Sequence, residues 1–165
     1  MTEKIKHYIK EIVIFLIFMT VITNVISMYK STSLNQEAFN IKNITLLNDA
    51  KFEYPHARPL LVHFWATWCP TCKLEASNIQ TLSKHYDVLT IAVKSGTKQE
   101  IQMWLNENEY DFNVVNDSSG FISSNFNIAA FPTTFIYNKN KELVFSEVGY
   151  TSTWGLWLRM WWASL

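Results

Sequence analysis

The chain has 165 residues, of which 48% are hydrophobic, 15% aromatic and 17% charged. This composition is too apolar for a disordered chain and too charged for a protein with many membrane spans. The 14 basic and 14 acidic residues give a formal net charge of zero, so the basic footprint of a nucleic-acid-binding protein is missing and no nucleic-acid partner is expected. The length favours one globular domain with room for an appendage.

An uncharged segment of about 18 residues lies near the N-terminus, between Glu11 and Lys30, which is close to the lower limit for a membrane-spanning helix. It is preceded by three lysines: Lys4, Lys6 and Lys10. Lysine bias keeps the flanking end of a span in the cytoplasm. We therefore expect a cytoplasmic tail at residues 1–11 and a single transmembrane signal-anchor at residues 12–29.

Two other interpretations of this segment stay open. A cleaved signal peptide is disfavoured because Val25 and Ser27 form a poor small-residue cleavage pattern and the residues beyond them are bulky. A helix in a soluble core is the third interpretation. Residues 30–43 are mostly polar and lack strong periodicity, so they are expected to form a tether to a folded domain at residues 44–165.

The remaining sequence alternates between strand-like and helix-like segments. Strands are expected at 44–47, 60–66, 88–93, 112–115, 133–137 and 143–148. Helices are expected at 70–86, 97–108, 121–126 and 151–163. The nearly continuous apolar run at 60–66 is typical of a strand buried on both faces of a sheet. This order predicts an α/β fold, a mixed sheet with helices on both faces.

The only two cysteines, Cys69 and Cys72, lie where a buried strand is expected to turn into a helix. Two cysteines three residues apart in a first helical turn can approach within disulfide range. Cys69 would face the unpaired N–H groups and the positive end of the helix dipole, which favour the reactive thiolate. Cys69 is therefore the predicted nucleophile, and the more buried Cys72 is the predicted resolving thiol.

Two other roles for this cysteine pair are weaker. A permanent structural disulfide would add little stability because the loop that it closes is short. A zinc site would need two more ligands, and the candidate histidines are scattered: His56, His63 and His85. Cu(I) can be held by two sulfurs, so a copper-binding module without turnover remains an alternative, although the five methionines are dispersed.

The segment Phe64–Cys72 resembles the active site of thioredoxin-like proteins, above all the membrane-anchored bacterial branch that includes the thiol reductants of cytochrome c maturation. Residues 88–96, 116–120, 130–137 and 148–162 resemble the suppressor-of-copper-sensitivity protein D type of periplasmic disulfide oxidoreductase. The resemblance implies a thioredoxin-like mixed sheet flanked by helices. It also implies attachment to the bacterial inner membrane with the domain in the periplasm.

Two parts of the site follow from this resemblance. Phe131-Pro132 matches the family's cis-proline loop beside the disulfide, whose backbone pairs with an extended substrate chain. The alternative is an ordinary trans proline at the start of a strand. Glu75 matches a glutamate of anchored members and would take the proton of Cys72, one turn away on the same helical face. The alternative for Glu75 is a solvated helix residue.

Residues beside the pair are further candidates for substrate contact: Trp68, Pro70 and Thr71. Plain core packing is the alternative for Trp68. His63 falls within the buried strand and is expected to be a hydrogen-bonded core histidine rather than a ligand.

The terminal helix carries tryptophans at helical spacing: Trp154, Trp157 and Trp161. They either pack on the sheet or rest on the membrane interface, where tryptophan rings are favoured.

These observations predict an anchored thiol–disulfide oxidoreductase that faces the periplasm and acts on protein thiols or disulfides, reducing or repairing rather than oxidising. Its redox centre would be the Cys69–Cys72 disulfide itself, with no metal and no other cofactor. The resemblance implies a polytopic membrane thiol reductase as electron donor and a link to copper tolerance. The alternatives are a thiol reductant of apocytochrome c and a Cu(I)-binding module.

Overall fold

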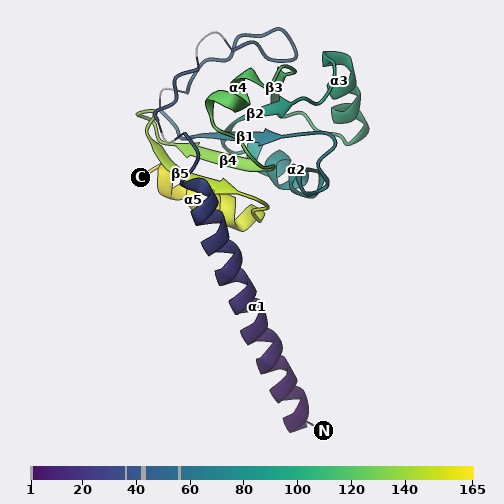
Figure 1. Ribbon diagram of the computed structural model, residues 1–165, viewed down its shortest axis with the longest axis vertical. Helices are drawn as coiled ribbons and strands as arrows, with labels where there is room; N and C mark the ends of the chain where they lie inside the picture. Colours follow the sequence, from purple (N-terminus) through teal and green to yellow (C-terminus); the bar gives the residue numbers. More distant parts are fainter. Residues whose placement is uncertain (1, 36, 42–43, 56) are drawn as a thin grey trace.

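The computed structural model describes residues 2–35, 37–41, 44–55 and 57–165. One long helix extends away from a domain built on a single sheet (Figure 1). The helices are α1 (Thr2–Ser31), α2 (Pro70–Ser83), α3 (Lys98–Glu107), α4 (Phe121–Asn125) and α5 (Thr153–Ala163). The strands are β1 (Leu60–Trp65), β2 (Asp87–Val93), β3 (Asn113–Asp117), β4 (Thr133–Tyr137) and β5 (Leu143–Val148).

The sheet has five strands in the order β3-β2-β1-β4-β5. The first three strands along the chain are parallel, β4 runs antiparallel to β1, and β5 runs antiparallel to β4. The central strand β1 is buried along its whole length, as its apolar run predicted. The predicted mixed sheet is confirmed.

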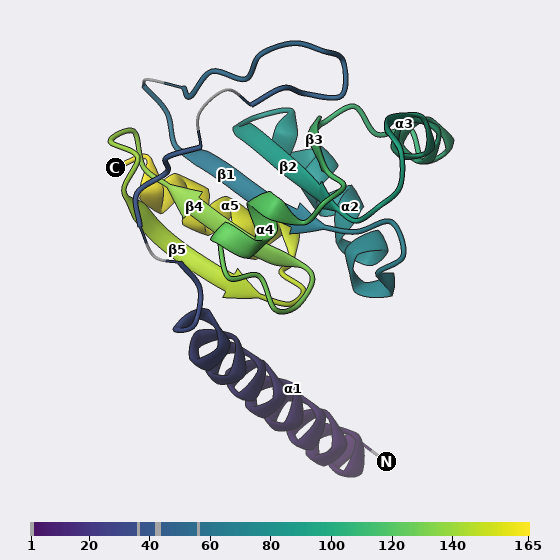
Figure 2. The same cartoon turned by 45° about the horizontal axis from the view of Figure 1, so that its top comes forward.

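Each face of the sheet has its own core because side chains alternate along a strand. Leu61 and Trp65 of β1 pack with residues of α2, α3 and α5. Leu60, Val62 and Phe64 pack on the opposite face, which α4 covers together with the chain before β1. Figure 2 shows α4 on one side of the sheet and α5 on the other. The prediction of helices on both faces is confirmed.

The segment before the domain differs from the expected tether. Leu34 and Phe39 are buried in the core on the α4 side. Backbone hydrogen bonds join Asn35 to Phe126 and Phe39 to Lys141. The described residues of this segment beyond α1 are therefore packed onto the domain as irregular chain. The segment shows no periodicity because a few widely spaced apolar side chains hold it. Positions 36, 42 and 43 of the expected tether lie outside the described residues.

The expected strand at 44–47 is also different. Within this stretch Thr45 makes only an isolated bridge to Lys51. A short apolar run fits a loop that covers a core as well as it fits a strand, and the run carries no other strand signal.

The helix α1 is the one helix of the described chain long and apolar enough to cross a membrane, with mean hydropathy 2.3 in Ile5–Ser31. None of its most apolar stretch is buried against the rest of the protein, so the alternative of a soluble core helix is wrong. The helix touches the domain near its C-terminal end, where Ser27 Oγ accepts a hydrogen bond from the backbone N–H of Val148 at 3.0 Å.

Candidate active site

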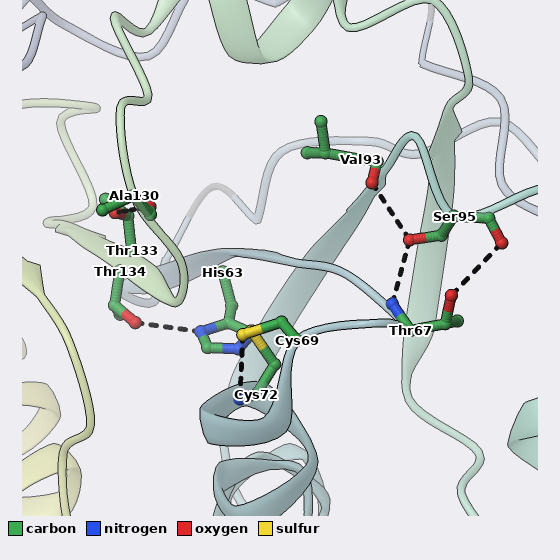
Figure 3. The surroundings of a disulfide bond; sticks show 9 residues. All are labelled: His63, Thr67, Cys69, Cys72, Val93, Ser95, Ala130, Thr133 and Thr134. Atoms are coloured by element: carbon green, nitrogen blue, oxygen red, sulfur yellow. Dashed lines mark hydrogen bonds between the residues drawn. A yellow bond between two sulfur atoms is a disulfide. The ribbon is translucent and has the colours of Figure 1, made fainter.

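Hydrogen bonds with residues at the end of β2 hold the loop between β1 and α2 in place. The backbone N–H of Thr67 donates to Ser95 Oγ at 3.1 Å, and the Ser95 hydroxyl donates to the carbonyl oxygen of Val93, also at 3.1 Å (Figure 3). The Thr67 hydroxyl in turn reaches the carbonyl of Ser95 at 3.4 Å. These bonds fix where α2 begins. The sequence alone does not reveal this role of Ser95, because its partner Thr67 lies 28 residues away.

Cys69 caps the N-terminus of α2, and Pro70 takes the first helical position. Proline fits there because that N–H has no partner within the helix. Cys69 and Cys72 form a disulfide, with their Cα atoms 5.3 Å apart. The backbone N–H of Cys72 donates to Cys69 Sγ at 3.2 Å. This places Cys69 sulfur at the positive end of α2, the position that stabilises a thiolate after reduction.

The two cysteines differ in exposure in the expected direction. Cys69 is 6% exposed and Cys72 1%. Pro70 is exposed and Thr71 half-buried beside them. Cys69 is therefore the more accessible of the two cysteines, and Cys72 lies on the inner side of the pair.

An aromatic pair borders the disulfide. The Phe131–Pro132 peptide bond is cis, which confirms the expected cis-proline and rules out the trans alternative. Phe131 is half-buried and meets the ring of Trp68 edge-on, with centroids 5.6 Å apart. Trp68 itself is 59% exposed, and its indole N–H donates to the carbonyl of Lys94. The alternative of plain core packing for Trp68 is wrong, because the ring is tethered at its polar edge and open to solvent.

Glu75 is fully buried on the inner side of α2, so the solvated alternative is wrong. Its Oε1 accepts from the backbone N–H of Thr151 at 3.3 Å, whereas Oε2 has no hydrogen-bond partner among the described residues. The pKa of Glu75 is raised to about 8: burial is the largest cause, the hydrogen bond from the Thr151 N–H opposes the rise, and the nearby Glu147 charge adds to it. At neutral pH this carboxyl is largely protonated, one helical turn from Cys72.

His63 lies in β1 on the same side of the sheet as the cysteines, and Figure 3 shows its ring beside the disulfide. Its Nδ1 is 2.9 Å from Thr134 Oγ1. Burial lowers the pKa of His63 to about 3, so the ring is neutral at physiological pH. The predicted hydrogen-bonded core histidine is confirmed. Its closeness to the disulfide was missed, although the parity of β1 carries the signal, since Leu61 and Trp65 share its face.

The described residues contain no group of three or more His, Cys, Asp or Glu side chains that could hold a metal ion. His85 lies elsewhere, with its ring 5.1 Å from that of Trp157. His56 is outside the described residues. A zinc donor set is thus not assembled in the described part of the chain, and the two sulfurs alone would have to serve Cu(I).

The known proteins that resemble this chain include a thiol-disulfide oxidoreductase. The model of the AhpC/TSA family matches residues 32–146. A thioredoxin-like protein of Haemophilus influenzae is 36% identical over 108 residues, 64% of this chain and 64% of that protein. The sporulation thiol-disulfide oxidoreductase A of Bacillus subtilis is 27% identical over 96 residues, 54% of this chain and 58% of that protein.

The chain spans less than two thirds of the length of these curated relatives. Among solved structures, that of StoA from Bacillus subtilis superposes with a TM-score of 0.63 at 21% identity, covering 76% of this chain and 96% of StoA. At this identity the likeness shows the fold, and the fold is thioredoxin-like.

Proposed function

This chain belongs to the AhpC/TSA family, and on that premise we propose that it is a membrane-anchored thiol–disulfide oxidoreductase acting on protein thiols. The observation that carries the proposal is the disulfide at the start of α2, in which the Cys72 N–H already points at Cys69 Sγ. A permanent structural disulfide has no need of this arrangement. A relative that carries the name thiol-disulfide oxidoreductase also matches this chain.

The reductive reaction proceeds in two exchanges. The Cys69 thiolate attacks a client disulfide, forms a mixed disulfide and expels one client thiolate. The Cys72 thiolate then attacks Cys69 sulfur, releases the second client thiolate and closes the Cys69–Cys72 disulfide. Two electrons pass from the pair to the client.

Glu75 is placed to manage the proton of Cys72. Its raised pKa of about 8 lies close to that of an ordinary thiol, so proton transfer between the two groups costs little. When an electron donor reopens the disulfide, protonated Glu75 returns the proton to the departing Cys72 thiolate. The unpartnered Oε2 is the carboxyl atom left free for this exchange.

Phe131 and its neighbours would receive the client. The backbone beside the cis-Pro132 bond pairs with an extended client chain, and the exposed Trp68 ring offers an apolar contact next to Cys69. Pro70 and Thr71 lie beside Cys69 and complete the surface that would contact the client. Only 6% of Cys69 is exposed, so the client must bring its own sulfur to this surface.

The anchor places this chemistry at a membrane. The apolar helix α1 and the lysines before its apolar stretch support a single span in the bacterial inner membrane, with the domain in the periplasm. A reductant in an oxidising compartment needs electrons from elsewhere. We therefore propose a polytopic membrane thiol reductase as donor, brought close by the tethering.

Trapping the mixed disulfide tests the proposed function. In the full chain, Cys72→Ser should accumulate client adducts through Cys69 that dissolve on reduction, since the resolving thiol is gone. Cys69→Ser is the matched control and should trap none. The absence of adducts in both variants, together with tight Cu(I) retention by the unaltered chain, would favour the copper-binding alternative.

The identity of the client separates the narrower assignments. The suppressor-of-copper-sensitivity type predicts that loss of the protein makes growth copper-sensitive while c-type cytochromes stay intact. Loss of c-type cytochromes would instead identify apocytochrome c as the client. The redox state of the pair in cells gives the direction, because a reductant is kept mainly reduced by its donor.

A further inference from the structure

The helix α5 is apolar on two opposite faces. Leu156, Met160 and Ala163 are buried and face the sheet core. The opposite face, which we call the α5 outer face, consists of Trp154, Leu158, Trp161 and Trp162, which are between 52% and 86% exposed. These positions recur at helical spacing and form one stripe. An exposed apolar stripe of this size marks a surface that contacts something else.

The α5 outer face carries no charge that would oppose an apolar partner. Arg159 is the one charged residue between Thr153 and Ala163. Its guanidinium is paired with Glu147 and also donates to the carbonyl of Gly155 at 2.9 Å. The charge is thus drawn to the side of the helix, away from the stripe.

The anchor helix ends beside this stripe. A cleft of ≈ 450 Å³ is lined by Ser27 and Ser31 of α1 and by Leu158 and Trp162 of α5, among other residues. In Figure 1, α5 lies at the end of the domain from which α1 extends. The contact between Ser27 and Val148 holds the two parts in this relation. Leu158 and Trp162 of the stripe therefore lie beside the outer end of α1.

In the proposed anchoring, the outer end of α1 lies at the surface of the membrane. The uncharged stretch of α1 ends at Tyr29, before Lys30, and about 18 to 20 residues suffice to cross the hydrocarbon core. Ser27 and Ser31 thus lie at the outer boundary of the span. Leu158 and Trp162 share their cleft and reach the same boundary. Tryptophan rings are favoured at the headgroup level, where one edge is apolar and the other wet.

We propose that the α5 outer face rests on the outer leaflet of the bilayer that α1 spans. The occupant is a lipid surface, and the inference rests on the proposed anchoring of α1. Two attachments, one through the helix and one through the stripe, stop the domain from rotating about the anchor. Cys69 is then presented to a membrane-embedded electron donor in one orientation.

Tryptophan emission tests this contact, because α1 contains no tryptophan and bilayer quenching must come from the domain. The full chain is placed in lipid nanodiscs, one chain per disc. Lipids brominated near the headgroup end of the acyl chain should quench emission by about a third, and lipids brominated near the chain end should quench less. The variant with Trp154, Trp161 and Trp162 changed to Phe should lose this quenching.

Two matched charge variants distinguish contact through the α5 outer face from quenching that arises only because the domain is close to the membrane. Leu158→Glu should reduce the quenching by about half or more, because it sets a charge in the stripe. Leu74→Glu changes an equally exposed leucine of α2 and should leave the quenching unaltered; Leu74 is 72% exposed and Leu158 63%. Equal quenching in both variants would overturn the inference.

Vesicle flotation distinguishes failure of the inference from failure of the anchor. Chains that float with alkali-washed vesicles but show no headgroup-level quenching would retain the anchor and overturn the α5 contact. Chains that do not float would refute the anchoring itself. A stripe that becomes covered only when chains are crowded in one vesicle would identify a second copy as its partner and also overturn the inference.

Discussion

The helices α2 and α5 pack side by side on the same face of the sheet. A surface helix usually buries an apolar face and exposes a polar one, and the two helices depart from this pattern in opposite ways. The helix α2 shows mostly polar residues outward and hides an acid, Glu75, on its buried side. The helix α5 is apolar on its buried side and apolar again outward. Residues that depart from a local pattern point to function, because they do not stabilise the fold by themselves. The proposed function assigns the buried acid of α2 to proton transfer with Cys72, and the proposed lipid contact accounts for the exposed apolar face of α5.

The largest expected effect distinguishes the two faces of α5. Leu156→Ala should cost about 2–5 kcal/mol of unfolding free energy, because Leu156 is 1% exposed and its removal leaves a cavity. Leu158→Ala should change the unfolding free energy by about 0.5 kcal/mol or less, because Leu158 is 63% exposed. Urea unfolding of the full chain in a mild detergent measures both. Equal losses would mean that the outer leucine is part of the core.

The next effect concerns the buried acid of α2. Folding raises the pKa of Glu75 from 4.5 to about 8, so the folded chain binds more protons over that range. Stability should therefore fall as pH rises through the range and level off above about pH 8. Below about pH 6.5 an opposing contribution enters from His63, whose pKa folding lowers to about 3 and whose neutral form favours folding as pH rises.

Glu75 therefore dominates the pH dependence of stability between pH 6.5 and 8. In the oxidised chain, where the cysteines do not titrate, stability should drop by on the order of 2 kcal/mol across this range. Glu75→Gln should remove this slope while keeping the hydrogen bond from Thr151. A variant that retains the full slope would show that another group is responsible and would weaken the proton-handling role of Glu75.

Local sequence patterns were sufficient for most of the sheet and for the Cys69–Cys72 pair. A continuous apolar run, a proline at a helix start and a two-cysteine spacing are signals that neighbouring residues carry by themselves. The packing of Leu34 and Phe39 could not be predicted from sequence, since it depends on contacts with residues 126 and 141 far along the chain. Burial of widely spaced apolar residues leaves no period to detect.

The role of Glu75 was undecided in the sequence for the same kind of reason. Its environment is made by Thr151, which lies 76 residues away and covers the inner side of α2. The α5 tryptophans allowed two interpretations because the helix has apolar residues on both sides. In the structure the two interpretations apply to different tryptophans. Trp157 packs edge-on against Tyr86, with ring centroids 5.3 Å apart, whereas Trp154 and Trp161 are exposed.

The proposed chemistry requires that the start of α2 holds the sulfur of Cys69 as a thiolate. The most direct measurement is the pH dependence of alkylation in the reduced full chain, with each cysteine identified by mass spectrometry. Cys69 is expected to react first, with a midpoint pH clearly below the ~8.5 of a free thiol. Reaction of Cys72 before Cys69, or a Cys69 midpoint at or above that value, would contradict this expectation.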